Sequence, residues 1–148
     1  MVSPLAGRLS DRLGTRLMLI TGVAVMGLST LYLSTFASGA SPIWVSLGVL
    51  GAGIAFALTN SPANNAAVDA LAKEQVGVGM GIFQGALYLG AGAGASMIGA
   101  LLSARRDTLQ ALNPLYTLEA TAYSDAFLAA AASAAVALIA AFGLRGGR

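Results

Sequence analysis

The stretch Gly7-Arg8-Leu9-Ser10-Asp11-Arg12-Leu13-Gly14-Thr15-Arg16 carries the strongest indication of the fold class of this chain. Three arginines and one aspartate lie within these ten residues, and 52 uncharged residues follow, from Leu17 to Val68. A compact basic turn ahead of so long an uncharged stretch is typical of a cytoplasmic loop that leads into two membrane-spanning helices. The pattern therefore predicts an integral membrane protein.

The composition agrees with a protein that has the lipid bilayer as its solvent. Of the 148 residues, 57% are hydrophobic and 9% are charged, whereas soluble domains average about 25% charged residues. A soluble fold of this composition would expose large apolar patches and aggregate. The net charge of +2 is small and scattered, which argues against nucleic acid as a partner. Because the chain has no histidine and no cysteine, we expect neither an enzyme nor a metal or cofactor site.

Four segments that are uncharged, apart from Asp125 at the start of the last one, are each long enough to cross the roughly 30 Å hydrocarbon core as a helix. We place these spans at 17–36, 43–60, 77–103 and 125–144. The remaining segments are a cytoplasmic loop at 1–16, a second one at 61–76, an extracellular loop at 104–124 and a cytoplasmic tail at 145–148. The predicted fold class is therefore all-α integral membrane, with four transmembrane helices. The fourth span is rich in alanine and depends on its neighbours for insertion; the alternative, a helix on the membrane surface, conflicts with its lack of a charged face.

Lysine and arginine set the expected orientation in the membrane. Six of these residues fall on one side of the four spans and two on the other. The six are Arg8, Arg12, Arg16, Lys73, Arg145 and Arg148, and the two are Arg105 and Arg106. Cytoplasmic loops carry the excess of positive charge. We therefore expect a multi-pass protein of the cell membrane (the inner or plasma membrane) with both termini in the cytoplasm.

Glycines crowd the third span and recur at four-residue spacing. The positions concerned are Gly77, Gly81, Gly85, Gly90 and Gly94. Spacing of four puts bare backbone on one face of a helix, where another helix can approach closely. A phosphate-binding loop is excluded, because no strand is expected before these glycines and no phosphate-binding motif occurs among them. The spacing therefore predicts a helix-packing face.

Polar side chains inside the apolar spans mark the candidate functional residues. Asn60, Asn64 and Asn65 cluster at the inner end of the second span, while Gln84 and Tyr88 lie four apart on one face of the third. Two interpretations stay open: these side chains line a cavity that a transported molecule contacts, or they cap helix ends and bridge neighbouring helices. No acidic or basic residue lies deep in any span.

The opening stretch resembles the loop signature of the major facilitator superfamily, a large class of membrane transporters. In that signature a glycine, an Asp-Arg pair, a second glycine and nearby basic residues join two helices on the cytoplasmic side. The matching positions here are Gly7, Asp11, Arg12, Gly14 and Arg16. The glycines permit a sharp turn, and Asp11 suits the N-terminus of the following helix, whose dipole favours an anion. The resemblance implies that this loop latches the cytoplasmic side in one of the alternating states.

More of the chain is similar to the late helices of the fourteen-span drug and tetracycline proton antiporters. The similarity is carried by Ala72 to Gly81, Gly90 to Gly94 and Gly99 to Ser103, and by the outward loop before the last span. It implies that the chain forms the last four helices of a longer transporter, whose remaining helices are its partners. The implied activity is secondary-active efflux of small amphipathic compounds by alternating access, with protons as the coupling ion.

The resemblance also implies where each helix lies relative to the central cavity. The chain differs from the family pattern at one position. It implies that the second span lines the central cavity, that the third borders it, and that the first and fourth face lipid. Tetracycline exporters carry an acidic residue in the glycine-rich late helix, where this chain has Ala91. Proton coupling would then rest on carboxylates outside this segment. Two alternatives stay open: an inactive transporter fragment, and a stand-alone four-span oligomeric protein, although the first span lacks the acidic residue that small multidrug exporters use.

Overall fold

The computed structural model describes residues 15–37, 40–108 and 110–143. Over these residues the chain forms α2 (Thr15–Tyr32), a π-helical continuation η1 (Leu33–Ala37), α3 (Pro42–Asp69), a short 3₁₀ turn η2 (Lys73–Gln75), α4 (Val76–Ala104) and α5 (Thr121–Gly143). These three ranges contain no β-strand. Four of their helices are long and apolar enough to span a membrane, which confirms the all-α membrane fold class.

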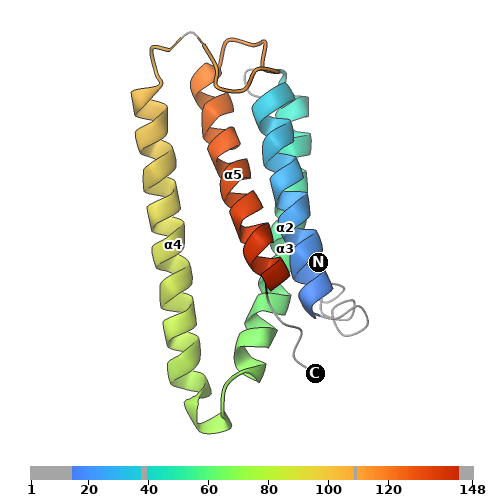
Figure 1. Ribbon diagram of the computed structural model, residues 1–148, viewed down its shortest axis with the longest axis vertical. Helices are drawn as coiled ribbons and strands as arrows, with labels where there is room; N and C mark the ends of the chain where they lie inside the picture. The colour runs from blue at the N-terminus through green and yellow to red at the C-terminus, as the bar shows by residue number, and fades with distance from the viewer. Residues whose placement is uncertain (1–14, 38–39, 109, 144–148) are drawn as a thin grey trace.

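The four long helices run up and down beside one another (Figure 1). α2, α3 and α5 lie together, whereas α4 stands apart from them over most of its length. The buried share of each span agrees with this arrangement. It is 28% for the span at Leu17–Phe36 and 0% for the span at Lys73–Ala104. The start of α2, the turn between α3 and α4, and the end of α5 lie at one end of the bundle, as alternating spans require.

Glycines allow α2 and α3 to approach each other closely. A Cβ atom built on Gly48 would overlap the side chain of Leu33, and one built on Gly51 would overlap the hydroxyl of Ser29. Gly48 is buried, and Leu33 is only 3% exposed. Small residues at such contacts bring helix backbones near enough for extensive van der Waals packing, which drives helix association in lipid. The sequence analysis did not single out these glycines.

Alanines line the contact between α5 and α2. The buried ones on α5 are Ala126, Ala131, Ala134 and Ala141. A Cβ atom on Gly27 of α2 would lie 3.6 Å from the Cβ of Ala134, an ordinary van der Waals distance. The alanine-rich composition of α5 therefore supplies a smooth surface for close packing. The helix lies against α2 rather than apart on a surface, in keeping with the expected dependence of this span on its neighbours.

α3 extends farther than the sequence predicts. The segment Asn60-Ser61-Pro62 favoured a helix end near Asn60 and a loop at 61–76, but the helix continues to Asp69 with Pro62 inside it. A proline removes one backbone donor and crowds the carbonyl four residues earlier. Helices at membrane depth tolerate this where neighbouring groups compensate for the lost hydrogen bond. Pro62 is fully buried, and the contacts around its ring offset part of the cost of the lost hydrogen bond.

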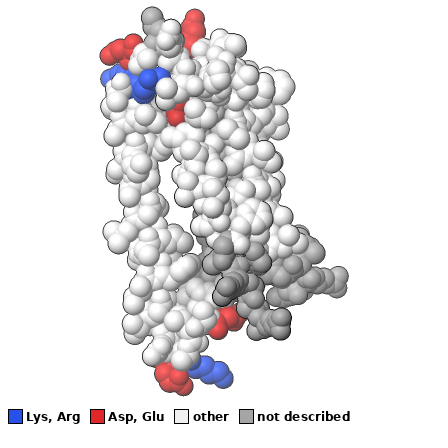
Figure 2. Space-filling model, in the orientation of Figure 1, with Lys and Arg blue, Asp and Glu red and all other residues white. Residues whose placement is uncertain are grey.

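Charged side chains gather at the two ends of the bundle (Figure 2). Lys73 and Glu74 belong to the turn between α3 and α4, and Arg105 and Arg106 directly follow α4. The long flank between the two ends shows almost no acidic or basic side chain in this view. An uncharged band bounded by charged ends is the surface that a bilayer requires of a multi-pass protein.

Candidate functional site

Three polar side chains form a chain of hydrogen bonds between α3 and α4, which we call the amide cluster. The side-chain Nδ2 of Asn64 donates to the backbone carbonyl and to Oδ1 of Asn60, each at 2.8 Å. The Oδ1 of Asn64 accepts from Nε2 of Gln84 on α4 at 3.2 Å. Asn60 and Asn64 share a face because they lie four residues apart on one helix. The structure thus joins residues of two spans that are 20 positions apart.

A hollow of about 430 Å³ opens beside the amide cluster. It is lined by α3 residues alone: Phe56, Ala57, Asn60, Ser61, Asn64 and Asn65. The lining combines amide and hydroxyl groups, which donate and accept hydrogen bonds, with an apolar and aromatic surface. None of these six residues is acidic or basic. Such a surface suits a small amphipathic molecule and contains no acid–base pair for catalysis.

The structure brings together four of the five candidates from the sequence. Asn60, Asn64 and Asn65 line the hollow, and Gln84 bonds to Asn64. Tyr88 is 72% exposed and is not among the residues that line this hollow. Asn64 both bridges two helices and lines the hollow, so the geometry is compatible with both interpretations of these amides.

The glycine face of α4 meets no other part of the described chain. A Cβ atom built on Gly77, Gly81, Gly85, Gly90 or Gly94 would find nothing within 4 Å. The predicted packing of these glycines against a helix therefore stays a prediction, and it needs helices other than α2, α3 and α5. Gly79 on the same helix does make a close contact, with the side chain of Leu71 in the preceding turn.

Most of the predicted signature loop lies outside the described residues. Gly7, Asp11, Arg12 and Gly14 belong to this part of the chain, and Arg16 follows the first residue of α2. The conformational role that the family resemblance implies for these five positions stays a prediction.

A second polar network, which the sequence analysis missed, lies at the opposite end of the bundle from η2. Asp125 on α5 is only 1% exposed. Its Oδ2 accepts from Nε of Arg105 at 2.6 Å, and its Oδ1 accepts from the backbone N–H of Leu112 at 2.7 Å. Arg105 also donates to the carbonyl of Gln110 at 2.7 Å. We call this arrangement the loop clasp, because it fixes the connection between α4 and α5 onto α5.

Two serines extend the loop clasp to η1, which continues α2. The Ser34 hydroxyl lies 2.8 Å from the carbonyl of Ser124, and the Ser124 hydroxyl lies 2.7 Å from the carbonyl of Ser34. Asn113 in the connection donates to the hydroxyls of Ser34 and Thr35, each at 3.0 Å. Both serines are fully buried. The sequence offered one signal for this network, an acidic residue at the start of the last apolar run. Its partner Arg105 lies 20 positions earlier and comes close only when the chain folds back.

Burial also shapes the chemistry of the connection between α4 and α5. Tyr116 is 8% exposed, and its hydroxyl oxygen accepts from the backbone N–H of Ala120 at 2.8 Å. Desolvation raises the pKa of this phenol. The hydroxyl therefore stays protonated at neutral pH and serves as a structural hydrogen-bonding group.

Comparisons with known proteins identify the class of this protein. The sequence model of the Major Facilitator Superfamily matches residues 1–147. The chain therefore belongs to this family of multi-pass membrane transporters and is not an enzyme. The resemblance drawn from the opening stretch and the glycine-rich segments is confirmed.

Curated relatives share part of this chain. The Multidrug resistance protein Stp of Mycobacterium tuberculosis strain CDC 1551 / Oshkosh is 34% identical to it over 105 residues. The Stp protein of strain ATCC 25618 / H37Rv matches to the same extent. The matched segment covers 70% of this chain and 19% of the length of these relatives. No solved structure matches the chain significantly.

Proposed function

We propose that this chain acts as the last four helices of a secondary-active exporter of small amphipathic compounds, of the drug/proton antiport type. Membership of the major facilitator superfamily supports transport. The name of the relative Stp supports drugs as the substrate class. In a member of this family, transport would proceed by alternating access around a site near the middle of the membrane.

The observation that carries the proposal is the hollow beside the amide cluster. It offers amide groups of Asn60, Asn64 and Asn65 next to the aromatic ring of Phe56. A drug-like compound presents the same mixture of hydrogen-bonding groups and apolar area. Uncharged amides bind such compounds without demanding one particular charge pattern, which is compatible with a broad range of substrates.

The exposed glycine face of α4 supports the view that further helices complete the transporter. Added Cβ atoms on the glycines of this face meet no other atom of the described chain within 4 Å, and α4 contains no buried residue. Four helices arranged in this way leave the α3 hollow open on one side. In our proposal, additional helices cover the glycine face and close the cavity, and the loop at Gly7 to Arg16 latches its cytoplasmic side.

Proton coupling requires an acidic residue outside the central part of the described spans. Asp125 is the buried carboxylate of α5, but it lies in the second turn of that helix and is bound to Arg105. We therefore assign it to the loop clasp and not to proton transfer. Six of the eight basic residues fall on the side of the two termini and only Arg105 and Arg106 on the other, which supports the proposed orientation in the cell membrane, with both termini in the cytoplasm.

Export assays on the complete transporter test the role of the hollow. Cells that produce the protein with Asn64→Ala should change their relative resistance to a panel of amphipathic compounds, because the substitution removes two hydrogen-bonding groups from the lining. Ser133→Ala provides a matched control, since the Ser133 hydroxyl donates to the carbonyl of Ala130 within its own helix and Ser133 does not line this hollow.

Thermal unfolding of the purified variants separates cavity lining from helix bridging. Bridging hydrogen bonds within membranes contribute about 0.6 kcal/mol on average, so loss of the Gln84 contact alone should lower stability slightly and reduce the export of all compounds equally. A substrate-dependent change with a nearly constant Tm supports the proposed cavity. Unchanged export of every compound by the Asn64→Ala variant would contradict it.

A further inference from the structure

A second hollow, which we call the aromatic hollow, lies at the end of the bundle opposite η2. Three aromatic side chains line it: Tyr32 at the end of α2, Phe36 in η1 and Trp44 in the first turn of α3. The remaining lining residues are Thr35, Ala40, Thr117 and Leu118. Its volume of about 550 Å³ is typical of a pocket for a small molecule. It shares no lining residue with the hollow beside the amide cluster.

The packing of α2 against α3 holds the rings of this hollow in place. A Cβ atom built on Gly48 would lie 3.1 Å from Cδ1 of Tyr32, so the bare backbone at Gly48 leaves room for the tyrosine ring. The centroids of the Tyr32 and Phe36 rings are 5.9 Å apart, a favourable distance for an aromatic pair. Phe36 is 63% exposed and Trp44 is 52% exposed. Both rings therefore have free surface that a ligand can cover.

The hydroxyl of Tyr32 is a buried polar group without a partner. Its oxygen is shielded from solvent and makes no hydrogen bond within the described part of the chain. Burial of a phenol takes it away from water, and the cost persists until an acceptor replaces the lost hydrogen bond. A ligand that supplies an acceptor oxygen at this position removes that cost.

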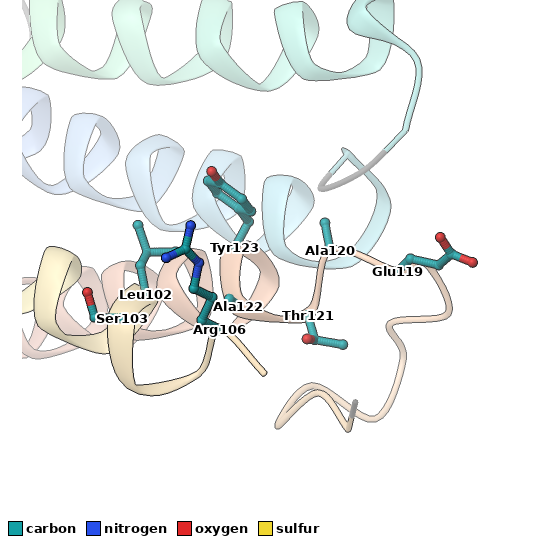
Figure 3. A pocket seen from close by; sticks show the side chains of 8 residues that line it. All are labelled: Leu102, Ser103, Arg106, Glu119, Ala120, Thr121, Ala122 and Tyr123. Atoms are coloured by element: carbon teal, nitrogen blue, oxygen red, sulfur yellow. The ribbon is translucent and has the colours of Figure 1, made fainter. Parts of the chain in front are cut away.

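The lining of the aromatic hollow indicates the charge of its ligand. None of its seven described lining residues is acidic or basic. The groove between the end of α4 and the start of α5 differs in this respect, because both Arg106 and Glu119 line it (Figure 3). A charged ligand that leaves water without a partner charge pays a large desolvation cost. The aromatic hollow therefore favours an uncharged ligand.

An apolar hollow of about 370 Å³ adjoins the aromatic hollow, since Tyr32 and Trp44 line both. Val25 and Leu28 of α2 and Leu47 of α3 contribute to its lining. The apolar surface thus continues along the two helices, next to the unpartnered hydroxyl of Tyr32.

We propose that the aromatic hollow binds an uncharged planar aromatic compound that carries a hydrogen-bond acceptor, such as an aryl ketone. The aromatic part of the compound packs against Phe36 and Trp44, and its oxygen accepts from the Tyr32 hydroxyl. Flat aromatic surfaces pair favourably in offset or tilted arrangements. This site is additional to the proposed transport cavity, and its binding test does not depend on transport.

Fluorescence titration of the purified chain in detergent tests the site, because Trp44 is the single tryptophan of the 148 residues. Acetylnaphthalene should quench Trp44 saturably. Tyr32→Phe should weaken this binding about fivefold, as expected for one hydrogen bond, and should leave the affinity for ethylnaphthalene, which has no acceptor, unchanged. The Tm of this variant should not fall, since the hydroxyl has no partner in the described chain.

Tyr123→Phe is the matched control, because it removes a tyrosine hydroxyl from the separate groove of Figure 3. It should leave both affinities unchanged. Phe36→Ala should weaken the binding of both compounds about fivefold, the factor typical of one aromatic pair.

Several results would overturn the proposal. Quenching that rises linearly without saturation would show partition into the detergent micelle. Equal affinity of the wild-type and Tyr32→Phe proteins for acetylnaphthalene would remove the role of the hydroxyl, as would an equal loss in Tyr123→Phe. If phosphatidylcholine added to the micelles abolishes the quenching, the hollow is a lipid contact and the proposal is wrong. Tighter binding of a naphthyl trimethylammonium ion would contradict the choice of an uncharged ligand.

Discussion

Asp125 is the residue whose removal should destabilise this protein most clearly. Its carboxylate is only 1% exposed and accepts two short hydrogen bonds, from Arg105 and from the backbone of Leu112. Asp125→Ala leaves both donors without their acceptor in a partly buried setting. Breaking a buried ion pair by removing one partner costs about 3–5 kcal/mol. The connection between α4 and α5 should then detach from α5.

Asparagine is the informative second substitution at this position. Its side-chain Oδ1 could still accept from the Leu112 N–H, but its amide nitrogen would face Arg105, which is also a donor. Asp125→Asn should therefore lose the ion pair and keep the backbone contact, at about half the cost of Asp125→Ala. Hydrogen bonds to charged groups contribute about 1.5–3 kcal/mol each. Loss of one of the two bonds of Asp125 should therefore cost about half as much as loss of both.

Thermal unfolding in detergent measures these differences. A change of 1 kcal/mol shifts Tm by about 2–4 °C for a domain of this size, so Asp125→Ala should lower Tm by on the order of 10 °C. The double variant Arg105→Gln with Asp125→Asn should lose less stability than the sum of its two single variants, because the pair is broken only once. A shift under about 2 °C for Asp125→Ala, or strict additivity in this cycle, would refute the assignment of Asp125 and Arg105 to one buried pair.

Two further substitutions test helix packing, each by thermal unfolding with a matched control. Gly48→Ala should destabilise the chain by about 1–3 kcal/mol, because the new methyl group overlaps Leu33. Gly85→Ala on α4, where an added Cβ meets nothing, should instead stabilise the isolated chain by about 0.5–1 kcal/mol; equal effects at the two positions would contradict the described packing. Ser124→Ala should cost about 1 kcal/mol through loss of its bond to the Ser34 carbonyl. The control Ser133→Ala should change stability by less than about 0.5 kcal/mol. Similar losses in the two variants would show that the Ser34–Ser124 pair does not contribute specifically to stability.

The position of the helices followed from the sequence, but the length of one helix did not. Uncharged runs of span length predict membrane helices because every backbone group in lipid must be hydrogen-bonded within its own segment. This argument located α2, α4 and α5 within a few residues. It failed at Pro62, where local preference favours a turn and burial of the proline within the bundle keeps the helix intact to Asp69. Local propensity is a weak guide wherever tertiary contacts compensate for it.

The candidate polar residues also followed from the sequence, but their partners did not. Asn60, Asn64 and Gln84 are conspicuous because amides are rare in apolar spans, while the bond between Asn64 and Gln84 depends on how α3 and α4 are placed relative to each other. Spacing along one helix says which side chains share a face. It does not say which face of another helix they meet. The sequence therefore identified the residues of the amide cluster but not the hydrogen bonds between them.

The membrane-spanning class and the membership of the major facilitator superfamily could be read from the amino-acid order alone, because hydropathy and short loop signatures are local properties of the chain. Which glycines pack and which lie open depended on the folded arrangement. Gly48 and Gly51 make close contacts between α2 and α3, whereas the more regular glycines of α4 remain uncovered. The fold also pairs Asp125 with Arg105. Such pairings connect residues 20 positions apart, and their energies depend on burial, which no local pattern specifies.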